Sequence, residues 1–458
     1  MSDWRLGLYH HLPPPFRSAA ASLRGYQLRW WRYGPEIERL VAEALEREQW
    51  TPERWQAWRE ERLARVLHTA ATKVPYYREM WAMRRRSGDR APWEDLRNWP
   101  PLEKEALRRH PRAFLSEDAD PARMFHDHTS GTTGKAIDLW LPREAVREWY
   151  ALAEARWRRW YGVSMHDRWG ILGGQLITPA ARRRPPFWVW NAPMKQLYLS
   201  SYHLSPDLIP HYLEAIAKYR LQYLLGYTSS LYTLALRALE LRWPRLELKA
   251  IITNAEPIYD YQREVIAEAF QCPVRETYGM AETVAAASEC EAGALHLWPE
   301  AGVLESSPAG ELIATGLLNP AMPLIRYQIG DRAALAPAGP ACRCGRLLPR
   351  LSALEGRNDD VLHTTDGRRI GRLDPVFKSQ LPVREAQIIQ ERLDRLRVRY
   401  VPDEKFNAAA IDEIAERLRE RMGEIEIVFE RMEEIPRGPG GKFRAVICAL
   451  PPEEFPNK

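Results

Sequence analysis

Apolar and polar positions alternate with a helical period in the first part of the chain. Between residues 36 and 71 the apolar side chains recur at three- and four-residue spacing. Thr51 and Pro52 lie between the two runs and are typical of a helix start, because proline is tolerated in the first helical turn. The pattern therefore predicts two helices here, followed by a loop-rich stretch with prolines at 100, 101, 111 and 121.

The middle of the chain alternates short apolar runs with longer amphipathic ones. The short runs predict strands over 223–226, 248–253 and 274–278, and the longer runs predict helices over 207–218, 229–242 and 260–270. Strands that alternate with helices of this length favour parallel βαβ units. Ligands of such units bind at the carboxyl ends of the strands.

The pattern changes twice more. From 302 to 336 short strands with Gly and Pro turns predict a β-rich subdomain, and after 356 strands and one charged helix predict a separate α+β unit. The predicted fold class is α/β: a large domain with parallel sheets and the β-rich subdomain, plus a small, mobile α+β C-terminal domain. We expect an N-terminal helical segment over 1–120, a binding core over 121–356 and the C-terminal domain over 357–458.

Composition excludes several classes of protein. Of 458 residues 45% are hydrophobic and 10% aromatic, which excludes a largely disordered chain. The balance of 66 basic and 61 acidic residues, a net charge of +5, does not indicate a nucleic-acid-binding protein. No apolar run approaches the roughly 18 residues of a membrane-spanning helix. Five cysteines and no apparent secretory signal predict a cytoplasmic protein, as a monomer or homodimer.

The first 33 residues carry five arginines and one acid among Trp and Tyr side chains. One interpretation is peripheral contact with an anionic membrane surface. The interpretation we favour is a segment packed on the large domain, because the sequence LPPPF is expected to interrupt a long amphipathic helix.

A polar, glycine-rich segment is the most informative part of the chain. It reads Thr129, Ser130, Gly131, Thr132, Thr133, Gly134 and Lys135. Glycines let successive backbone N–H groups face one anion, and the hydroxyls and the ammonium add donors. Thr129 and Ala136 stand where a Walker P-loop needs Gly and Ser or Thr, so a P-loop NTPase is disfavoured.

Three later segments place acids at predicted strand ends or at a junction. Glu282 ends Tyr278-Gly279-Met280-Ala281-Glu282, Asp331 ends RYQIGD, and Asp359 lies in GRNDD at the predicted domain boundary. Alone, each has an ordinary interpretation as a helix-start acid, a turn residue or a linker.

Together and in this order, the four segments resemble the adenylate-forming superfamily of acyl-CoA synthetases and related ligases, over essentially the whole chain. The resemblance implies that residues 129–135 wrap the ATP phosphates, that Glu282 holds magnesium and that Asp331 binds the ribose. It also implies further nucleotide contacts, from Ala255, Glu256, Tyr278, Gly279 and Arg357. Asp359 would be the hinge between the domains. The segment PRGPGGKFR resembles the loop of the catalytic lysine, Lys442.

The match is closer to the phenylacetate–CoA ligase-like branch, which includes homologues found with capsular polysaccharide genes. It is carried by CRCGRLLPRLSALEGRNDD, ECEAGALHLWPE and GRRIGRLDPVFK. Ala136 and Ala281 depart from the superfamily's usual proline and threonine, which puts the substrate in doubt rather than the use of ATP.

Four potential soft metal ligands have the spacing C-x5-H and C-x-C: Cys290, His296, Cys342 and Cys344. Such a set suits tetrahedral structural zinc. The alternative is buried cysteines acting as small apolar residues, which is what we expect of Cys272 and Cys448. The branch resemblance also implies a zinc site.

The resemblance implies ATP-dependent adenylation of a carboxylic acid, aryl or similar, and transfer to the thiol of coenzyme A. Lys135 and Lys442 would face the phosphates, magnesium would lie on Glu282, and Tyr227 would line the acyl pocket. Two alternatives stay open: an amine, hydroxyl or carrier protein as acceptor, and a catalytically silent scaffold homologue.

Overall fold

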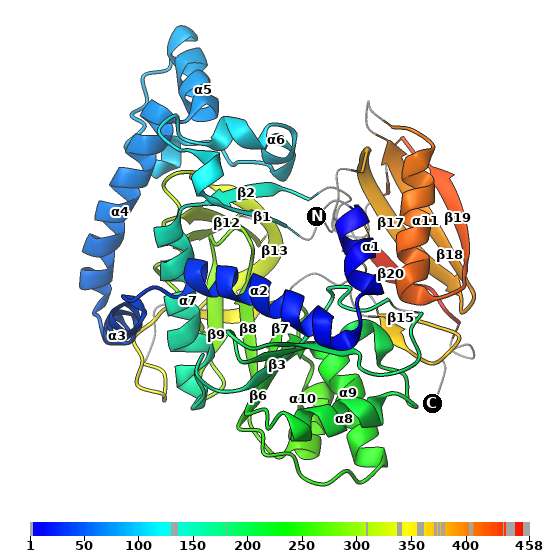
Figure 1. Ribbon diagram of the computed structural model, residues 1–458. Coiled ribbons are helices and arrows are strands. Elements are labelled where there is room, and N and C mark those ends of the chain that lie inside the picture. Colours follow the sequence, from blue (N-terminus) through cyan, green and yellow to red (C-terminus); the bar gives the residue numbers. More distant parts are fainter. Residues whose placement is uncertain are drawn as a thin grey trace.

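The computed structural model describes most of the chain. The described residues are 3–129, 136–179, 181–307, 310–336, 341–354, 361–370, 373, 376, 381–402, 406–433, 435–436 and 445–451. A large α/β body carries the N-terminal helices on one side, and a smaller unit formed by the end of the chain lies beside it (Figure 1). The predicted fold class is thus confirmed. The domain boundaries and the mobility of the smaller unit stay predictions.

Parallel strands form the centre of the large body. These are β3 (Trp169–Gly173), β5 (Gln196–Ser200), β6 (Tyr223–Tyr227), β7 (Ala250–Asn254) and β8 (Val274–Gly279). The helices that follow or join them are α8 (Ile209–Lys218), α9 (Thr228–Glu240) and α10 (Asp260–Phe270). Leu, Ile and aromatic side chains from both layers form one buried cluster. The βαβ prediction matches these elements closely because each has its own strong apolar pattern.

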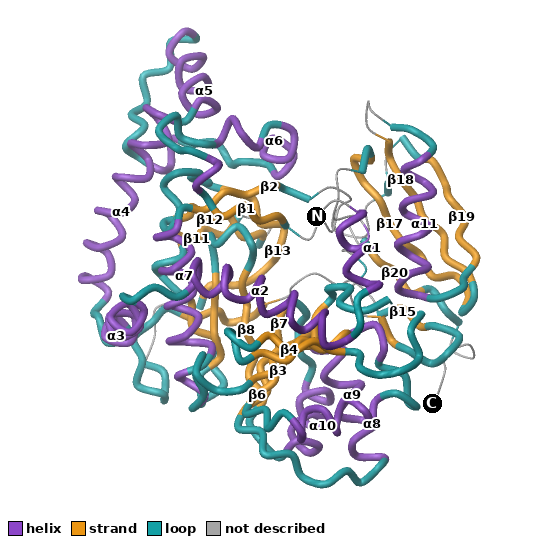
Figure 2. Tube along the Cα trace, in the orientation of Figure 1, coloured by secondary structure: helices purple, strands orange, loops and turns teal. Residues whose placement is uncertain are grey.

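Antiparallel strands extend the same hydrogen-bonded sheet to 12 strands, in the order β11-β12-β13-β14-β10-β9-β8-β7-β6-β3-β5-β4. They are β4 (Trp188–Asn191), β9 (Ala286–Glu289), β10 (Leu295–Leu297), β11 (Gly302–Ser306), β12 (Glu311–Gly316), β13 (Tyr327–Leu335) and β14 (Arg350–Leu354). The strands predicted as a β-rich subdomain are thus joined edge to edge with the parallel strands. Figure 2 shows this arrangement in orange. A separate hairpin contains β1 (Phe125–His128) and β2 (Asp138–Leu141).

Seven helices of the described chain precede or flank this sheet. They are α1 (Asp3–His11), α2 (Pro14–Arg32), α3 (Ile37–Arg47), α4 (Pro52–Lys73), α5 (Pro75–Arg86), α6 (Lys104–Arg109) and α7 (Arg143–Trp157). Short 3-10 turns lie at Leu96–Asn98, Pro111–Phe114, Pro121–Arg123, Arg159–Tyr161 and Ser201–His203. As expected, the LPPPF segment interrupts the helix, because α1 ends at His11 and α2 begins at Pro14. Pro14 and Pro15 lie in the first turn of α2, where a missing N–H costs nothing, so the helix that follows still has 19 residues.

The C-terminal unit has a four-stranded sheet in the order β19-β18-β17-β20. Its elements are β15 (Leu362–His363), β16 (Arg369–Ile370), β17 (Val383–Arg392), β18 (Arg395–Pro402), α11 (Ala409–Met422), β19 (Glu426–Arg431) and β20 (Val446–Cys448). The buried Arg368 joins this unit to the large body, because its Nη1 donates to the backbone oxygens of Tyr202 and Arg421 at 2.7 and 2.8 Å.

Candidate functional site

Several of the predicted site residues that the structure describes lie where the parallel strands end. Tyr227 is the last residue of β6 and pairs in register with Asn254, the last residue of β7. Ala255 follows with a left-handed φ of 64°, which turns the chain sharply at the strand end. Tyr278 and Gly279 close the neighbouring strand β8. Because parallel strands present their carboxyl ends at one edge, these positions from distant segments share that edge.

Two tyrosines hold the two predicted acids in a reciprocal arrangement. The hydroxyl of Tyr278 donates to Oδ2 of Asp331 at 2.9 Å, and the hydroxyl of Tyr327 donates to Oε1 of Glu282 at 2.7 Å. Each tyrosine precedes the acid of its own segment by four residues but bonds the acid of the other segment. The end of β8 and the start of β13 are therefore fastened to each other through both acids.

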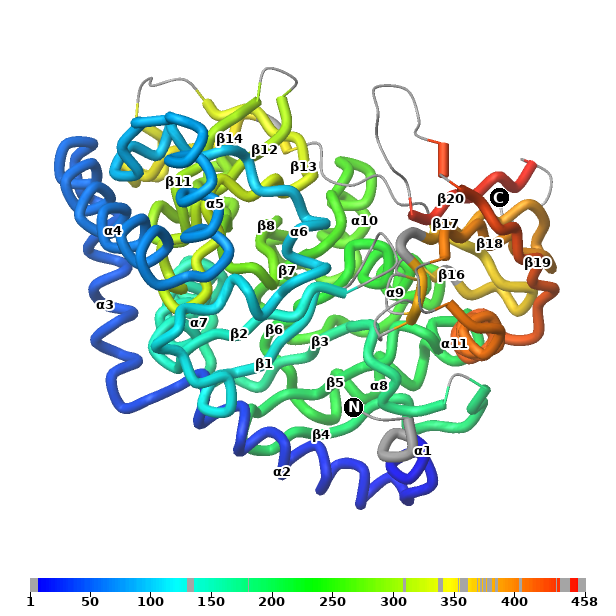
Figure 3. Tube along the Cα trace, turned by 90° about the horizontal axis from the view of Figure 1, so that it is seen from above, coloured from blue at the N-terminus to red at the C-terminus, as the bar shows by residue number. Residues whose placement is uncertain are grey.

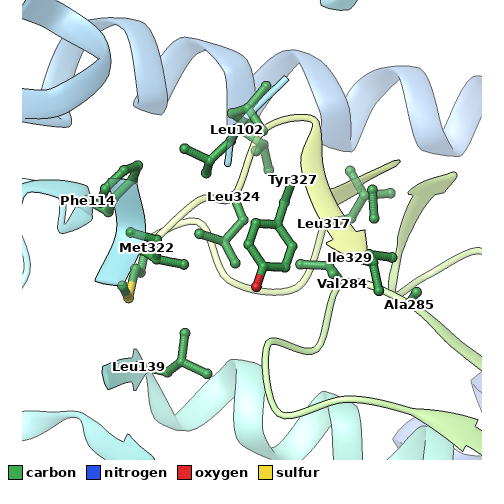
Figure 4. Close-up of a cluster of buried hydrophobic side chains, with 14 of the residues drawn as sticks. Leu102, Phe114, Leu139, Val284, Ala285, Leu317, Met322, Leu324, Tyr327 and Ile329 are labelled. Carbon is green, nitrogen blue, oxygen red and sulfur yellow. The ribbon is translucent and has the colours of Figure 1, made fainter. Parts of the chain in front are cut away.

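The ring of Tyr327 is fixed by its surroundings. It is fully buried in an apolar cluster with Leu102, Leu317 and Leu324, and Figure 4 shows it standing among these side chains. A ring held on all sides leaves its hydroxyl one position, so Glu282 is oriented by packing as well as by a hydrogen bond. We did not single out Tyr327 from the sequence. The pattern that could have indicated it is the spacing Tyr-x3-acid, which both segments share.

A second residue that the sequence analysis missed supports the Asp331 turn. Lys104 on α6 donates from Nζ to the backbone oxygen of Ile329, and Gly330 beside it has a φ of 79°. A β-carbon at Gly330 would approach this ammonium to 3.3 Å. The turn that carries Asp331 is therefore secured by a residue more than 200 positions earlier.

Glu256 has a local structural contact as well as its predicted nucleotide role. Its carboxylate accepts from the backbone N–H of Ser229 at 2.7 Å and from the hydroxyl of Ser229 at 3.1 Å. These contacts cap the first turn of α9, whose N-terminal end favours a negative charge. They also fasten the loop after β7 to the segment that begins at Tyr227.

Of the predicted phosphate-binding segment, the structure describes Thr129, at the end of the segment next to β1. The backbone N–H of Thr129 donates to the oxygen of Ile137, and the N–H of Ile137 donates to Oγ1 of Thr129, both at 3.0 Å. These bonds close the β1–β2 hairpin below residues 130–135. Residues Ser130, Gly131, Thr132, Thr133, Gly134 and Lys135 lie outside the described residues, as do Arg357, Asp359 and Lys442.

A pair of carboxylates lies within β8 and the neighbouring β9. Oε2 of Glu289 accepts from the backbone N–H of Glu276 at 2.7 Å and from Arg263 at 3.0 Å. Burial, and after it the charge of Glu289, raises the pKa of Glu276 to about 7, although Arg263 acts in the opposite direction. Glu276 therefore keeps its proton in the folded protein at pH values where the unfolded chain has lost it.

This raised pKa predicts a stability that falls as pH rises. The folded protein binds one more proton than the unfolded chain between the ordinary pKa of 4.5 and about 7, so the free energy of unfolding decreases across that window. We expect Glu276→Gln to remove this slope and to raise the unfolding free energy at pH 8 by about 1–2 kcal/mol. Urea unfolding between pH 5 and pH 8 measures it. The exposed Glu264 provides the control Glu264→Gln, and equal slopes in all three proteins would contradict the expectation.

The four predicted metal ligands converge. The ligand atoms of Cys290, His296, Cys342 and Cys344 all lie within 4.8 Å of one another. Sγ of Cys290 is 3.7 Å from Sγ of Cys342, and Sγ of Cys344 is 3.4 Å from Nε2 of His296. Three thiols and one imidazole at this separation fit the donor set and the size of a tetrahedral zinc site.

The surroundings of this cluster suit metal ligands too. The imidazole of His296 points Nε2 at the cluster because Nδ1 bonds the backbone oxygen of Leu348 at 3.1 Å, the outer contact that orients many metal-binding histidines. Tight turns at Gly293 and Gly345, with φ of 79° and 81°, follow Cys290 and Cys344. Cys290 directly follows β9, His296 lies in β10, and the other two cysteines precede β14. Because β14, β10 and β9 are neighbours in the sheet, the cluster links adjacent strands.

A recess of about 530 Å³ opens beside the β1–β2 hairpin. Its lining residues are Arg109, His110, Pro111, Arg112, Ala113, His126, Asp138 and Trp140. The ring of His126 stacks on Trp140 with centroids 5.1 Å apart and bonds Asp138 at 2.9 Å. Two guanidinium groups, two imidazoles and one carboxylate make the lining basic, with an indole as an apolar wall.

The chain is similar to known proteins over most of its length. Residues 362–449 match the family described as the CapK C-terminal domain. The chain is 25% identical to protein CapK of Staphylococcus aureus over 459 residues, covering 96% of this chain and 98% of that protein. It is 28% identical to a phenylacetate-coenzyme A ligase of Thermus thermophilus, covering 72% and 74% of the two chains.

The fold also occurs in a solved structure. A crystal structure of 2-hydroxyisobutyryl-CoA ligase in complex with 2-HIB-AMP and CoA, in the thioesterification state, superposes with a TM-score of 0.55 at 19% identity, covering 88% of this chain and 92% of that one. The predicted resemblance to adenylate-forming, phenylacetate–CoA ligase-like proteins with CapK among their relatives is confirmed by the sequence matches, which support an acid–CoA ligase-like enzyme. The solved structure shows the same fold.

Among the described residues, the helices are all too short or too polar to cross a lipid bilayer.

Proposed function

We propose that this protein activates a carboxylic acid with ATP and then transfers the acyl group to the thiol of coenzyme A. In the first step a carboxylate oxygen of the acid attacks the α-phosphorus of ATP, an acyl-adenylate forms and pyrophosphate leaves. In the second step the thiol attacks the acyl carbon, a thioester forms and AMP leaves. Similarity to phenylacetate-coenzyme A ligases supports this proposal.

The observation that carries the proposal is the reciprocal Tyr–acid pair. It brings two carboxylates from segments about 50 residues apart to the same region of the sheet, each oriented by one buried hydroxyl. In the proposed reaction Asp331 accepts hydrogen bonds from the ribose hydroxyls, while Glu282 takes magnesium that accompanies the nucleotide. Magnesium supplies charge neutralisation to the phosphate oxygens when bound.

Other residues enter the proposal through the superfamily resemblance. Thr129 and residues 130–135 bind the phosphates, with Lys135 on the leaving pyrophosphate. Ala255, Glu256, Gly279 and Arg357 contact the nucleotide. The ammonium of Lys442 reduces the repulsion between the attacking carboxylate and the α-phosphate, which is the main barrier between two anions. A rotation at Asp359 then withdraws Lys442, which leaves room for the thiol. Tyr227, at the end of β6, lines the acyl pocket in this proposal.

The basic recess supports coenzyme A as the acceptor. Coenzyme A carries an adenine ring and several phosphate charges, and the recess offers two guanidinium groups and an indole wall. The recess lies against β1 and β2, the two strands that lead into and out of the phosphate segment. An acceptor bound there approaches the adenylate from the side of its phosphates.

We also propose structural zinc on the Cys/His cluster. All four ligand positions would be filled by the chain, so the metal would stabilise the fold and leave no open position for a substrate. We further propose that the protein acts in the cytoplasm, where these cysteines stay reduced.

The central experiment is a pyrophosphate-release screen of the purified protein over aryl, hydroxy and aliphatic carboxylic acids, with and without coenzyme A. We expect acid-dependent release, with a thioester formed when coenzyme A is present. If an amine, an alcohol or a carrier protein accelerates pyrophosphate release and coenzyme A does not, that compound and not coenzyme A is the acceptor. The absence of acid-dependent release across the panel would favour a silent homologue.

Removing the hydroxyl of each tyrosine in turn distinguishes the proposed role of Asp331 from that of Glu282. We expect Tyr278→Phe to raise the KM for ATP about 10-fold, because Asp331 loses a donor, and Tyr327→Phe to raise the magnesium concentration needed for half-maximal rate by a similar factor. Initial rates at varied ATP and varied magnesium measure both effects.

The control is Tyr77→Phe. Tyr77 is buried in the same apolar cluster, but its hydroxyl donates to the backbone oxygen of Pro323 at 3.1 Å and faces neither acid. Equal effects of all three changes would mean that the hydroxyls act only through stability, contrary to the proposed positioning role.

A further inference from the structure

The outer face of α2 carries a row of large apolar side chains in contact with solvent. Phe16, Leu23, Tyr26 and Trp30 are 62%, 75%, 66% and 50% exposed, and Leu8 on α1 is 62% exposed. These are five of the eleven exposed large hydrophobic side chains among the described residues. Exposed apolar side chains are ordinary when scattered, whereas a concentration in one segment indicates an interaction surface.

The four residues of α2 lie on one side of the helix. Their spacing of 7, 3 and 4 residues keeps them within a narrow sector at 3.6 residues per turn. We call this row the outer stripe. Figure 3 shows α2 running along the periphery of the molecule next to β4.

The opposite side of α2 is fixed to the edge strand β4. A β-carbon at Gly25 would lie 1.9 Å from Oδ1 of Asn191, so the helix backbone touches the strand. The hydroxyl of Ser18 accepts from the N–H of Trp190 at 3.2 Å, and the buried Arg17 donates to Oγ1 of Thr178 at 2.6 Å. The inner face is therefore covered by this chain, and the packing predicted for the N-terminal segment is present there. The outer stripe is the side of α2 that this packing does not cover.

The charge carried by α2 itself is of one sign, although Asp127 lies close enough to Arg24 to act on its pKa. Residues 3–32 contain five arginines and one acid, Asp3. Arg24 and Arg29 are exposed on either side of the stripe, and Nη1 of Arg29 donates to the oxygen of Pro193 at 2.8 Å. Burial, and after it the charge of the neighbouring Arg182, lowers the pKa of the buried Arg17 at the start of the helix.

We propose that α2 binds the surface of a membrane that carries anionic lipids, lying parallel to that surface. The outer stripe enters the boundary between head groups and acyl chains, and the arginines beside it contact lipid phosphates. A tryptophan and a tyrosine within the stripe suit this boundary, because each has an apolar ring with one polar atom. The excess of arginine favours an anionic surface over a neutral one, and over an acid-poor protein partner. The 19 residues of α2 lie along the surface and do not cross it.

Vesicle flotation with the full-length protein tests this binding. We expect the protein to float with vesicles of equal phosphatidylglycerol and phosphatidylcholine, and to stay behind with phosphatidylcholine alone. High salt should weaken the binding, since the attraction is partly electrostatic. Leu23→Asp should lower the floated fraction at least fivefold, and Met83→Asp, which changes an exposed apolar residue of α5, should leave it unchanged.

Three results would overturn the proposal. One is a wild-type protein that does not float with the anionic vesicles. Another is flotation that Leu23→Asp leaves unchanged. The third is a wild-type dimer that Leu23→Asp converts to a monomer in light scattering, which would assign the outer stripe to a second copy of the chain. Acid-dependent pyrophosphate release by the same samples is read separately, so loss of vesicle binding and loss of activity stay distinguishable.

Discussion

Glu282→Gln is expected to lower acid-dependent pyrophosphate release by about 100-fold or more, equivalent to about 3 kcal/mol of transition-state stabilisation. Glutamine has nearly the same shape as glutamate, and its amide oxygen can still accept from the hydroxyl of Tyr327, as Oε1 of Glu282 does at 2.7 Å. The change therefore removes the negative charge while leaving the buried contact in place. A titration of magnesium at fixed ATP and acid measures the loss, and we expect the apparent magnesium affinity to fall with the rate.

A matched control is Glu291→Gln. Glu291 lies nine residues after Glu282 in the sequence. Its side chain is 54% exposed and paired with Arg346. We expect its magnesium profile to match the wild type. A wild-type magnesium profile in Glu282→Gln itself would show that this carboxylate does not hold the metal, and the proposed role would have to move to another acid.

Removal of zinc is expected to have the largest effect on stability. A metal that binds only the folded state contributes about 4 kcal/mol when its free concentration is about 1,000 times the Kd, so in a chain of 458 residues chelation should lower the Tm by roughly 4 °C. Cys342→Ser should have a similar effect, because its Sγ is 3.7 Å from that of Cys290 within the four-ligand cluster. Elemental analysis and thermal unfolding, before and after chelation, measure the two quantities.

Cys272→Ser provides the control for this experiment. Cys272 is outside the cluster, and burial raises the pKa of its thiol to about 12, so it behaves as a small apolar residue. This variant should retain zinc and respond to the chelator as the wild type does. A wild-type protein without zinc, whose Tm is the same with and without chelator, would leave the four side chains as a buried thiol cluster.

Local pattern was sufficient for most elements of the large body. The helix predicted over 260–270 is α10 at those bounds, and the strand predicted over 274–278 is β8 with one further residue. Such elements are predictable because their period and their end residues are local properties. The LPPPF segment was predictable in the same way, because its prolines separate α1 from α2 as expected. Two of them also begin α2, since proline is tolerated in the first helical turn.

The acids of the candidate site were predicted as single residues, but their relation to each other was not. Tyr278 and Asp331 are 53 positions apart, and Tyr327 and Glu282 are 45 apart. No local pattern specifies that each tyrosine bonds the acid of the other segment, because this depends on how β13 is joined to β8 through β14, β10 and β9. The convergence of four Cys and His side chains depends on the same strand order.

The sequence by itself determined the elements and the family resemblance, and it supplied the predicted phosphate, magnesium and zinc ligands, because each of these depends on a short segment. Tertiary structure alone decided which side of α2 is covered by β4, which side stays apolar and exposed, and which buried hydroxyl orients each acid. Those outcomes follow from packing between segments that are distant in the chain, and packing is a property of surfaces that form only when the chain has folded.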